Sequence, residues 1–99
     1  MEIRQLIYFV ETAEILNFSA AAKILRVSQS TLSQQIKQLE AELEEDLFCR
    51  NSHNVTLTEA GCELLPFARR TVREAANCQQ RINDIKKIAI GNLSIWLKE

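Results

Sequence analysis

The sequence of 99 residues contains only two glycines, one proline and one histidine. Glycine and proline are the residues that most favour tight turns, so their scarcity favours a helix-rich fold. No glycine-rich phosphate-binding loop is present, and the single histidine has no evident nucleophile partner. The composition therefore argues against an enzyme.

Cysteine is also scarce: Cys49, Cys62 and Cys78 are an odd number and lack C-x-x-C spacing. This pattern favours reduced thiols, packed as small apolar side chains in a cytoplasmic protein, over disulfides. Two alternatives stay open. One is a zinc site of Cys49, His53 and Cys62, which lacks an evident fourth ligand, and the other is a redox-sensitive exposed thiol. We expect no metal and no cofactor in these residues.

Long apolar runs are absent, and the amino-terminal residues do not have the build of a secretion signal. We therefore expect a cytoplasmic location. Hydrophobic residues make up 46% of the chain and charged residues 25%, which is typical of a folded domain. The length allows one domain, whose small core would gain stability from a second subunit.

The formal net charge of −1 is at first sight unfavourable for a nucleic-acid-binding protein, because DNA affinity comes largely from lysine and arginine. The acidic residues are unevenly distributed, however. Four of them form one cluster, and without these four carboxylates the formal charge would be +3: Glu42, Glu44, Glu45 and Asp46. The net charge therefore does not exclude DNA binding.

Two helical patterns joined by a short polar turn lie between Phe18 and Leu47, which is the outline of a helix-turn-helix. The first pattern, residues 19–26, is rich in small side chains. The second, residues 29–43, has apolar residues on one face: Leu32, Ile36, Leu39 and Leu43. Its opposite face carries short polar or basic side chains that are suited to a DNA major groove: Ser30, Ser33, Gln34 and Lys37.

The flanking segments complete a small domain. Residues 3–16 are predicted to form a helix with one apolar stripe, and Ser19 and Ser28 are predicted to cap the two helices of the motif. Residues 48–50 and 55–57 are predicted to form two short strands around a polar turn. Such a hairpin after a helix-turn-helix indicates a wing, in which Arg50 and His53 would contact the DNA backbone. An ordinary surface hairpin is the alternative.

A long helix is predicted after Thr58, with a seam of apolar or small residues at four-three spacing. The seam consists of Leu64, Ala68, Thr71, Ala75, Cys78, Ile82, Ile85 and Ala89. We expect its first part to pack on its own domain and much of the rest to form a homodimer. Such a dimer would place two recognition helices about one turn of DNA apart, as an inverted-repeat site requires. In the alternative arrangement, the whole stripe packs within one chain.

In their order and spacing, these motifs resemble the amino-terminal region of LysR-type transcriptional regulators. The resemblance runs from Met1 to about Ile90. It is carried by Glu2-Ile-Arg-Gln-Leu6, Tyr8-Phe9-Val10, Phe18-Ser19, Ala21-Ala22, Leu25, Val27-Ser28-Gln29, Leu32-Ser33, Gln35-Ile36, Leu39-Glu40, Leu43, Leu47-Phe48, Arg50 and Val55-Thr-Leu-Thr-Glu-Ala-Gly61.

The resemblance implies a mainly α-helical winged helix-turn-helix at residues 1–57 and a dimerising linker helix at 58–90. Residues 91–99 would be the truncated start of an effector-binding domain, with a strand beginning at 91–95. In the intact protein, which is expected to be bacterial and usually tetrameric, the missing domain would bind a small-molecule effector. Two other interpretations are a molybdate-responsive winged-helix regulator and a coiled-coil interaction module without DNA binding.

The resemblance also implies the residues that contact DNA. Gln29, Ser33 and Gln34 would enter the groove, with Ser28, Ser30, Thr31 and Lys37 nearby. Lys23 and Arg26 are expected at the DNA backbone, as exposed cations near the start of the recognition helix.

The chain departs from many relatives, which have proline at Ser30, arginine at Gln34, a second wing arginine at His53 and glycine at Glu44. Because glutamine pairs bidentately with adenine, Gln34 predicts an A/T-leaning half-site. A histidine titrates near pH 6.5, so His53 would add a phosphate contact that strengthens below that pH. Without glycine at Glu44, the recognition helix is expected to lack a left-handed cap.

Overall fold

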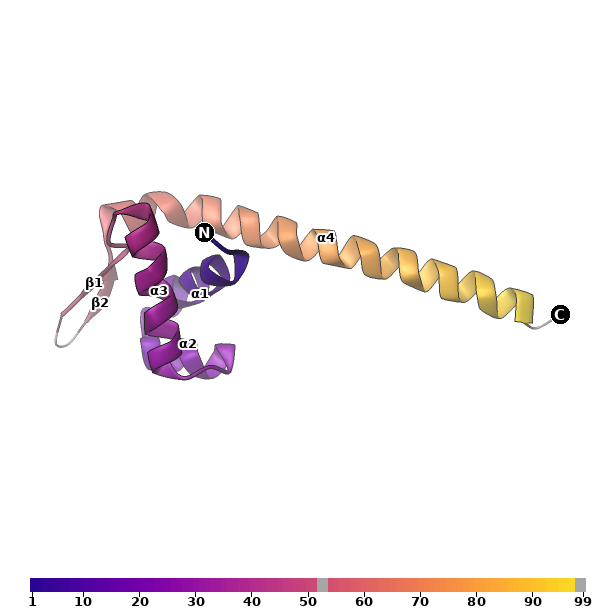
Figure 1. The fold of residues 1–99 in the computed structure, drawn as a ribbon, viewed down its shortest axis with the longest axis horizontal. Helices are drawn as coiled ribbons and strands as arrows, with labels where there is room; N and C mark the ends of the chain where they lie inside the picture. The colour runs from indigo at the N-terminus through magenta and orange to yellow at the C-terminus, as the bar shows by residue number, and fades with distance from the viewer. Residues whose placement is uncertain (52–53, 98–99) are drawn as a thin grey trace.

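The structure is a computed structural model that describes residues 1–51 and 54–97, with side chains described as far as residue 89. Figure 1 shows the short helices and the wing gathered at one end, with a long helix extending beyond them. The molecule is therefore elongated, with extents of 67 × 24 × 19 Å. In chain order its elements are α1 (Ile3–Ile15), α2 (Phe18–Leu25), α3 (Gln29–Leu43), β1 (Phe48–Arg50), β2 (Val55–Leu57) and α4 (Glu59–Leu97).

Side-chain caps determine where the helices of the motif begin. The Ser28 hydroxyl accepts a hydrogen bond from the Thr31 N–H at 3.0 Å, which confirms Ser28 as the cap of α3. The prediction of Ser19 as the cap of α2 is wrong. Instead, the side chain of Asn17 accepts from the Ala20 N–H at 2.9 Å. Asn17 has an extended backbone and a short acceptor, as a good N-cap requires, so α2 begins at Phe18.

All three short helices end on a non-glycine residue in the left-handed conformation: Leu16, Arg26 and Glu44. The expectation that α3 lacks such a cap is therefore wrong. Glu44 has φ 57° and ψ 34°, and its N–H donates to the carbonyls of Glu40 and Ala41. The left-handed conformation costs about 1–2 kcal/mol in a residue with a side chain. That cost is small enough for the packing of the chain after α3 to offset it.

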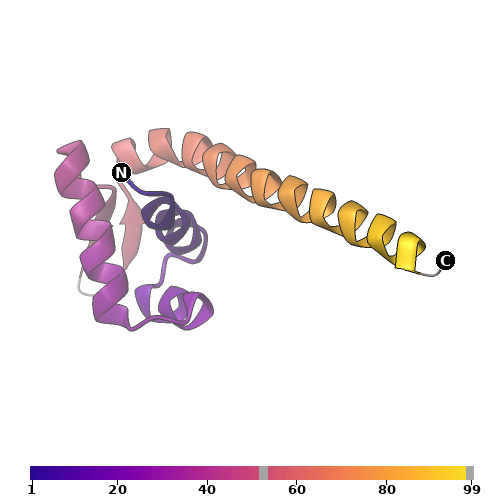
Figure 2. The same cartoon turned by 45° about the vertical axis from the view of Figure 1, so that its right-hand side comes forward.

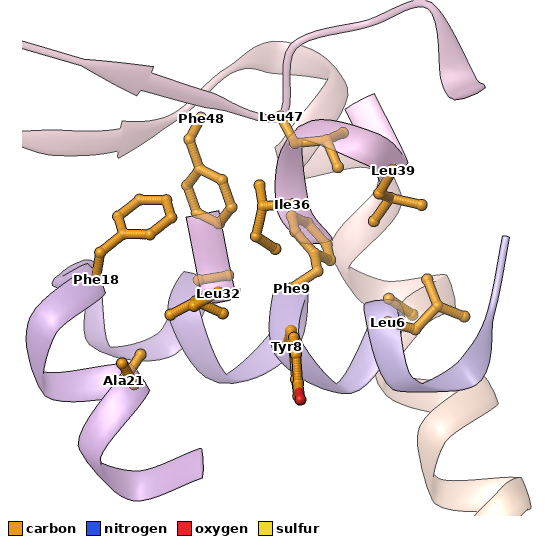
Figure 3. Close-up of a cluster of buried hydrophobic side chains, with 13 residues drawn as sticks. Leu6, Tyr8, Phe9, Phe18, Ala21, Leu32, Ile36, Leu39, Leu47 and Phe48 are labelled. Carbon is orange, nitrogen blue, oxygen red and sulfur yellow. The ribbon is translucent and has the colours of Figure 1, made fainter. Parts of the chain in front are cut away.

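The core lies where α1, α2, α3 and the base of the wing meet, and it confirms the predicted inner face of α3. Leu32, Ile36 and Leu39 are fully buried, as is Phe9 of α1. Figure 3 shows these side chains directed towards one another beneath the wing. Figure 2 shows that α3 stands at the edge of the domain, with no element covering the side that faces away from α1. One face of α3 therefore builds the core and the other is free.

The wing has the predicted strand boundaries and is antiparallel, with Phe48 opposite Leu57 and Arg50 opposite Val55. It is fastened to α3 by Glu40, whose carboxylate accepts from the N–H groups of Leu47 at 2.7 Å and Phe48 at 3.3 Å. This acidic side chain therefore positions the wing relative to α3.

The first turns of α4 attach the long helix to the wing and to α1. Thr58 donates its N–H to the Leu47 carbonyl, and its side-chain hydroxyl accepts from the Gly61 N–H, so it caps α4, which follows Thr58 as predicted. Further along, Ala68 is buried on the domain, and Arg69 pairs with Glu14 of α1 at 3.2 Å. The amino-terminal part of α4 is therefore part of the domain.

The expected strand at residues 91–95 is not present, because α4 continues as one helix to Leu97. The only sheet in the described part of the chain is the wing. A strand needs a neighbouring strand for its backbone hydrogen bonds, whereas a helix satisfies them within its own segment. Because no neighbouring strand is available in the described part of the chain, these residues form a helix.

Candidate nucleic-acid interface

The predicted groove-reading residues lie together on the free face of α3. Gln29, Ser30 and Gln34 are exposed, Ser33 is half-buried and Lys37 is exposed. A shallow groove of about 550 Å³ runs along this face, lined by Ser30, Ser33, Gln34, Lys37, Gln38 and Ala41. Among these residues only Lys37 is charged. The face therefore presents amide and hydroxyl groups, which hydrogen-bond base edges in a major groove.

Three of the predicted contact residues already have intramolecular partners. The Ser28 hydroxyl caps α3 and also donates to the Thr31 hydroxyl at 2.8 Å. The hydroxyls of Ser28 and Ser30 also lie 3.4 Å apart. Ser28 and Thr31 were predicted to contact DNA, but their hydroxyl groups already form hydrogen bonds within the protein. Their local function is to set where the recognition helix begins.

The elements of the motif and the wing carry four exposed cations: Lys23 in α2, Arg26 at its carboxyl end, Lys37 on the free face of α3 and Arg50 in β1. Among the residues that the structure describes, none of the four forms an ion pair. The cluster of acidic residues lies at the opposite end of α3 from its first turn, where Glu44, Glu45 and Asp46 line a groove together with Lys37 and Arg50. Phosphate groups near the first turn of α3 would therefore meet unpaired positive charge.

A second groove, of about 570 Å³, separates the wing from the starts of α2 and α3. Arg50 lies in it with its guanidinium carbon 4.2 Å from the centre of the Phe18 ring. Most of the polar residues that line this groove with Arg50 were not predicted, although their clustering at a cap and a turn was a usable signal. These are Asn17, Ser19, Asn51 and Asn54. His53 and its expected phosphate contact lie outside the described residues.

Some residues of the predicted seam on α4 pack on the domain, and others are exposed. Ala68 is only 2% exposed and belongs to the core, as expected for the first part of the seam, so its assignment to the dimer interface is wrong. Leu64 and Ala75 are half-buried, whereas Thr71, Cys78, Ile82 and Ile85 are exposed. Phe67 and Ile88 were missed: they are 60% and 64% exposed, on the same side of α4 as Ile85. The exposed face consists of Phe67, Thr71, Cys78, Ile82, Ile85 and Ile88.

The three cysteines are exposed, so the expectation that they pack as small apolar residues is wrong. Cys49 points away from the core because it follows the buried Phe48 in a strand, where successive side chains alternate. No group of three potential metal ligands occurs within residues 1–51 and 54–97, and His53 of the zinc alternative lies outside them. No helix in the described residues is apolar and long enough to span a membrane.

Known proteins with similar sequences are bacterial transcriptional regulators. The chain is 40% identical over 96 residues to the regulator IlvY of Escherichia coli, covering 97% of this chain. It is 37% identical over 97 residues to the nitrogen assimilation regulatory protein Nac of Klebsiella aerogenes, covering 98% of this chain. It spans 32% of the length of each. With BudR, a regulator of Klebsiella aerogenes, it shares 41% identity, covering 98% of this chain and 68% of that protein.

Solved structures with the same fold include regulators bound to DNA. The CbnR DNA-binding domain in its complex with DNA has a TM-score of 0.78 and 41% identity, covering 86% of this chain and 98% of that one. An OxyR mutant of Corynebacterium glutamicum has a TM-score of 0.81 and 38% identity, covering 83% of this chain and 26% of that one. The fold is therefore that of the DNA-binding domains of these regulators.

A family profile described as the bacterial regulatory helix-turn-helix protein, lysR family, matches residues 3–62. This match, which covers more than half of the chain, sets aside the molybdate-responsive alternative. The relatives are regulators, in agreement with the expectation that the chain is not an enzyme. The chain belongs to the LysR family of helix-turn-helix regulators and carries the DNA-binding domain of that family.

Proposed function

We propose that this chain is the operator-reading part of a bacterial, cytoplasmic LysR-type regulator and binds double-stranded DNA sequence-specifically as a homodimer. The free face of α3 carries this proposal, because it combines uncovered amide and hydroxyl groups with unpaired cations at its edge. Gln29, Ser33 and Gln34 would read bases, and Lys23, Arg26 and Arg50 would contact phosphates.

The dimer is proposed from the exposed face of α4. Isoleucines 82, 85 and 88 are 46%, 56% and 64% exposed, and Phe67 lies on the same side. At about 100° per residue, these four side chains fall within about 120° of one another. A second copy of α4 would cover this stripe and bring two copies of α3 to an inverted-repeat site. In the intact protein, a further domain would bind a small-molecule effector and support a tetramer.

The experiment that tests the proposal is selection of binding sites from a random duplex pool at near-physiological salt. We expect enrichment of an inverted repeat, with half-sites about one helical turn apart. A single enriched half-site would contradict the dimer. Weak, sequence-independent binding would contradict specific reading. Binding that does not fall as salt rises would favour the interaction-module alternative, because phosphate contacts require that fall.

Gln34 is expected to favour adenine at one position of each half-site. Replacing it with alanine should remove discrimination of about 1–3 kcal/mol at that position and leave the other positions unchanged. The repeated selection measures this effect. The matched control is Gln79→Ala, which removes an exposed glutamine of α4 and should leave the selected sequence unchanged. Uniform guanine opposite Gln34 would show that the predicted A/T preference is wrong.

Introducing a charge at Ile85 is expected to dissociate the dimer without unfolding the domain. Burying an isoleucine contributes about 1.5–3 kcal/mol, and a two-fold interface contains each residue twice. Ile85→Glu should therefore raise the dimer dissociation constant about a hundredfold or more, as measured by sedimentation equilibrium. Ala76→Glu adds the same charge on the opposite side of α4 and serves as control. Equal effects of both variants would contradict the proposed seam.

A further inference from the structure

The contact between Arg50 and Phe18 joins the wing to the first residue of α2. The guanidinium carbon lies 4.2 Å from the ring centre, within the range of a cation–π interaction. The two residues come from elements that are far apart in the sequence. Because the contact is made through the face of the ring, it uses none of the guanidinium's N–H donors.

The ring beneath Arg50 is held rigidly by the core. Phe18 is only 6% exposed, and its ring packs edge-on against Phe48, with ring centres 5.4 Å apart. Phe48 in turn packs edge-on against Phe9 at 5.5 Å. Figure 3 shows the rings of Phe18 and Phe9 beneath the wing, with the ring of Phe48 extending towards them from the wing itself. The surface on which Arg50 rests is therefore the end of a continuous aromatic cluster.

The guanidinium itself remains free for another partner. Within the residues that the structure describes, its N–H groups make no hydrogen bond and no ion pair. It lines the groove between the wing and the starts of α2 and α3, next to Gln29 and Ser33. An arginine held on a ring has fewer conformations to lose when it binds an anion.

We propose that Phe18 is a positioning residue for DNA binding: its ring holds the Arg50 guanidinium in the groove, ready for a backbone phosphate. This inference rests on the proposed function, because it assumes that Arg50 contacts DNA. It adds that the affinity contributed by Arg50 depends on a buried side chain that does not itself need to touch DNA.

The test is a double-mutant cycle on binding to the duplex that the wild-type chain selects from the random pool. The variants are Phe18→Leu, Arg50→Ala and the double substitution. Arg50→Ala should weaken binding and lower the slope of log affinity against log salt by about 0.9 for each phosphate that Arg50 neutralises. Phe18→Leu should weaken binding by about threefold to tenfold when Arg50 is present, and have no effect when position 50 is alanine.

Tyr8→Leu is the matched control, since it removes another buried ring of the core that does not stack on Phe18 in the described residues. Its effect on binding should be the same whether position 50 is arginine or alanine, at a temperature where circular dichroism shows every variant folded. If Phe18→Leu also has equal effects in the two backgrounds, its role is structural and the inference is overturned. If Arg50→Ala binds like the wild type, the phosphate contact is absent and the inference fails while specific binding through α3 stands. Failure of the selection itself would instead overturn the proposed function.

Discussion

Replacing Ile36 with alanine is expected to lower the free energy of unfolding by about 2–5 kcal/mol. Ile36 is fully buried in the middle of α3, where it packs in the same core as Phe9 and Leu39. The substitution shortens a side chain that is enclosed by several elements, which leaves a cavity that the surrounding side chains fill only in part. For a small domain, this loss is a large fraction of the total stability.

Urea unfolding followed by circular dichroism measures this effect. Gln34→Ala is the control from the same helix: it lies on the free face, so its stability should stay within about 0.5 kcal/mol of the wild type. DNA binding should show the reverse order at a temperature where both variants are folded, with Gln34→Ala the weaker binder. Similar stability losses in the two variants would contradict the assignment of an inner and an outer face to α3.

Replacing Gly61 with alanine is expected to destabilise the domain by about 3 kcal/mol, at the upper end of the usual cost of overpacking. A Cβ atom at this position would lie 2.3 Å from the Leu47 carbonyl oxygen and 2.9 Å from Cδ2 of Leu57. The carbonyl cannot retreat freely, because it accepts a hydrogen bond from the Thr58 N–H at 3.0 Å. The substitution therefore forces the start of α4 away from the base of the wing.

Thermal unfolding measures this second effect, and Cys62→Ala is its control. Cys62 is the exposed neighbour of Gly61, so its replacement should change the stability by no more than about 0.5 kcal/mol. Alanine is otherwise a better helix former than glycine by about 1 kcal/mol. A stabilised Gly61→Ala variant would therefore show that helix propensity outweighs the close approach to Leu47, contrary to what the geometry predicts.

The periodicity of α4 predicts which residues share a face, but not which part of the protein that face contacts. Four-three spacing identified a seam on α4, but spacing alone does not say against what each residue packs. The structure assigns Ala68 to the core and leaves Ile82 and Ile85 exposed, which agrees with the expectation that only the first part of the seam packs on its own domain. The exposed stripe instead begins at Phe67, which the strict spacing from Leu64 passed over. The direction of a stripe depends on where the helix crosses the rest of the domain.

The sequence by itself determined the helix-turn-helix, the two faces of α3, the cap at Ser28 and both wing strands. These features depend on residues a few positions apart: apolar spacing, a hydroxyl three residues before an N–H, and a polar turn between short β-rich segments. Only the tertiary structure decided that Glu40 fastens the wing and that Arg50 rests on Phe18. It also decided that Glu44 takes a left-handed conformation without glycine. These features depend on contacts that form only when separate elements pack together, and local pattern carries no information about them.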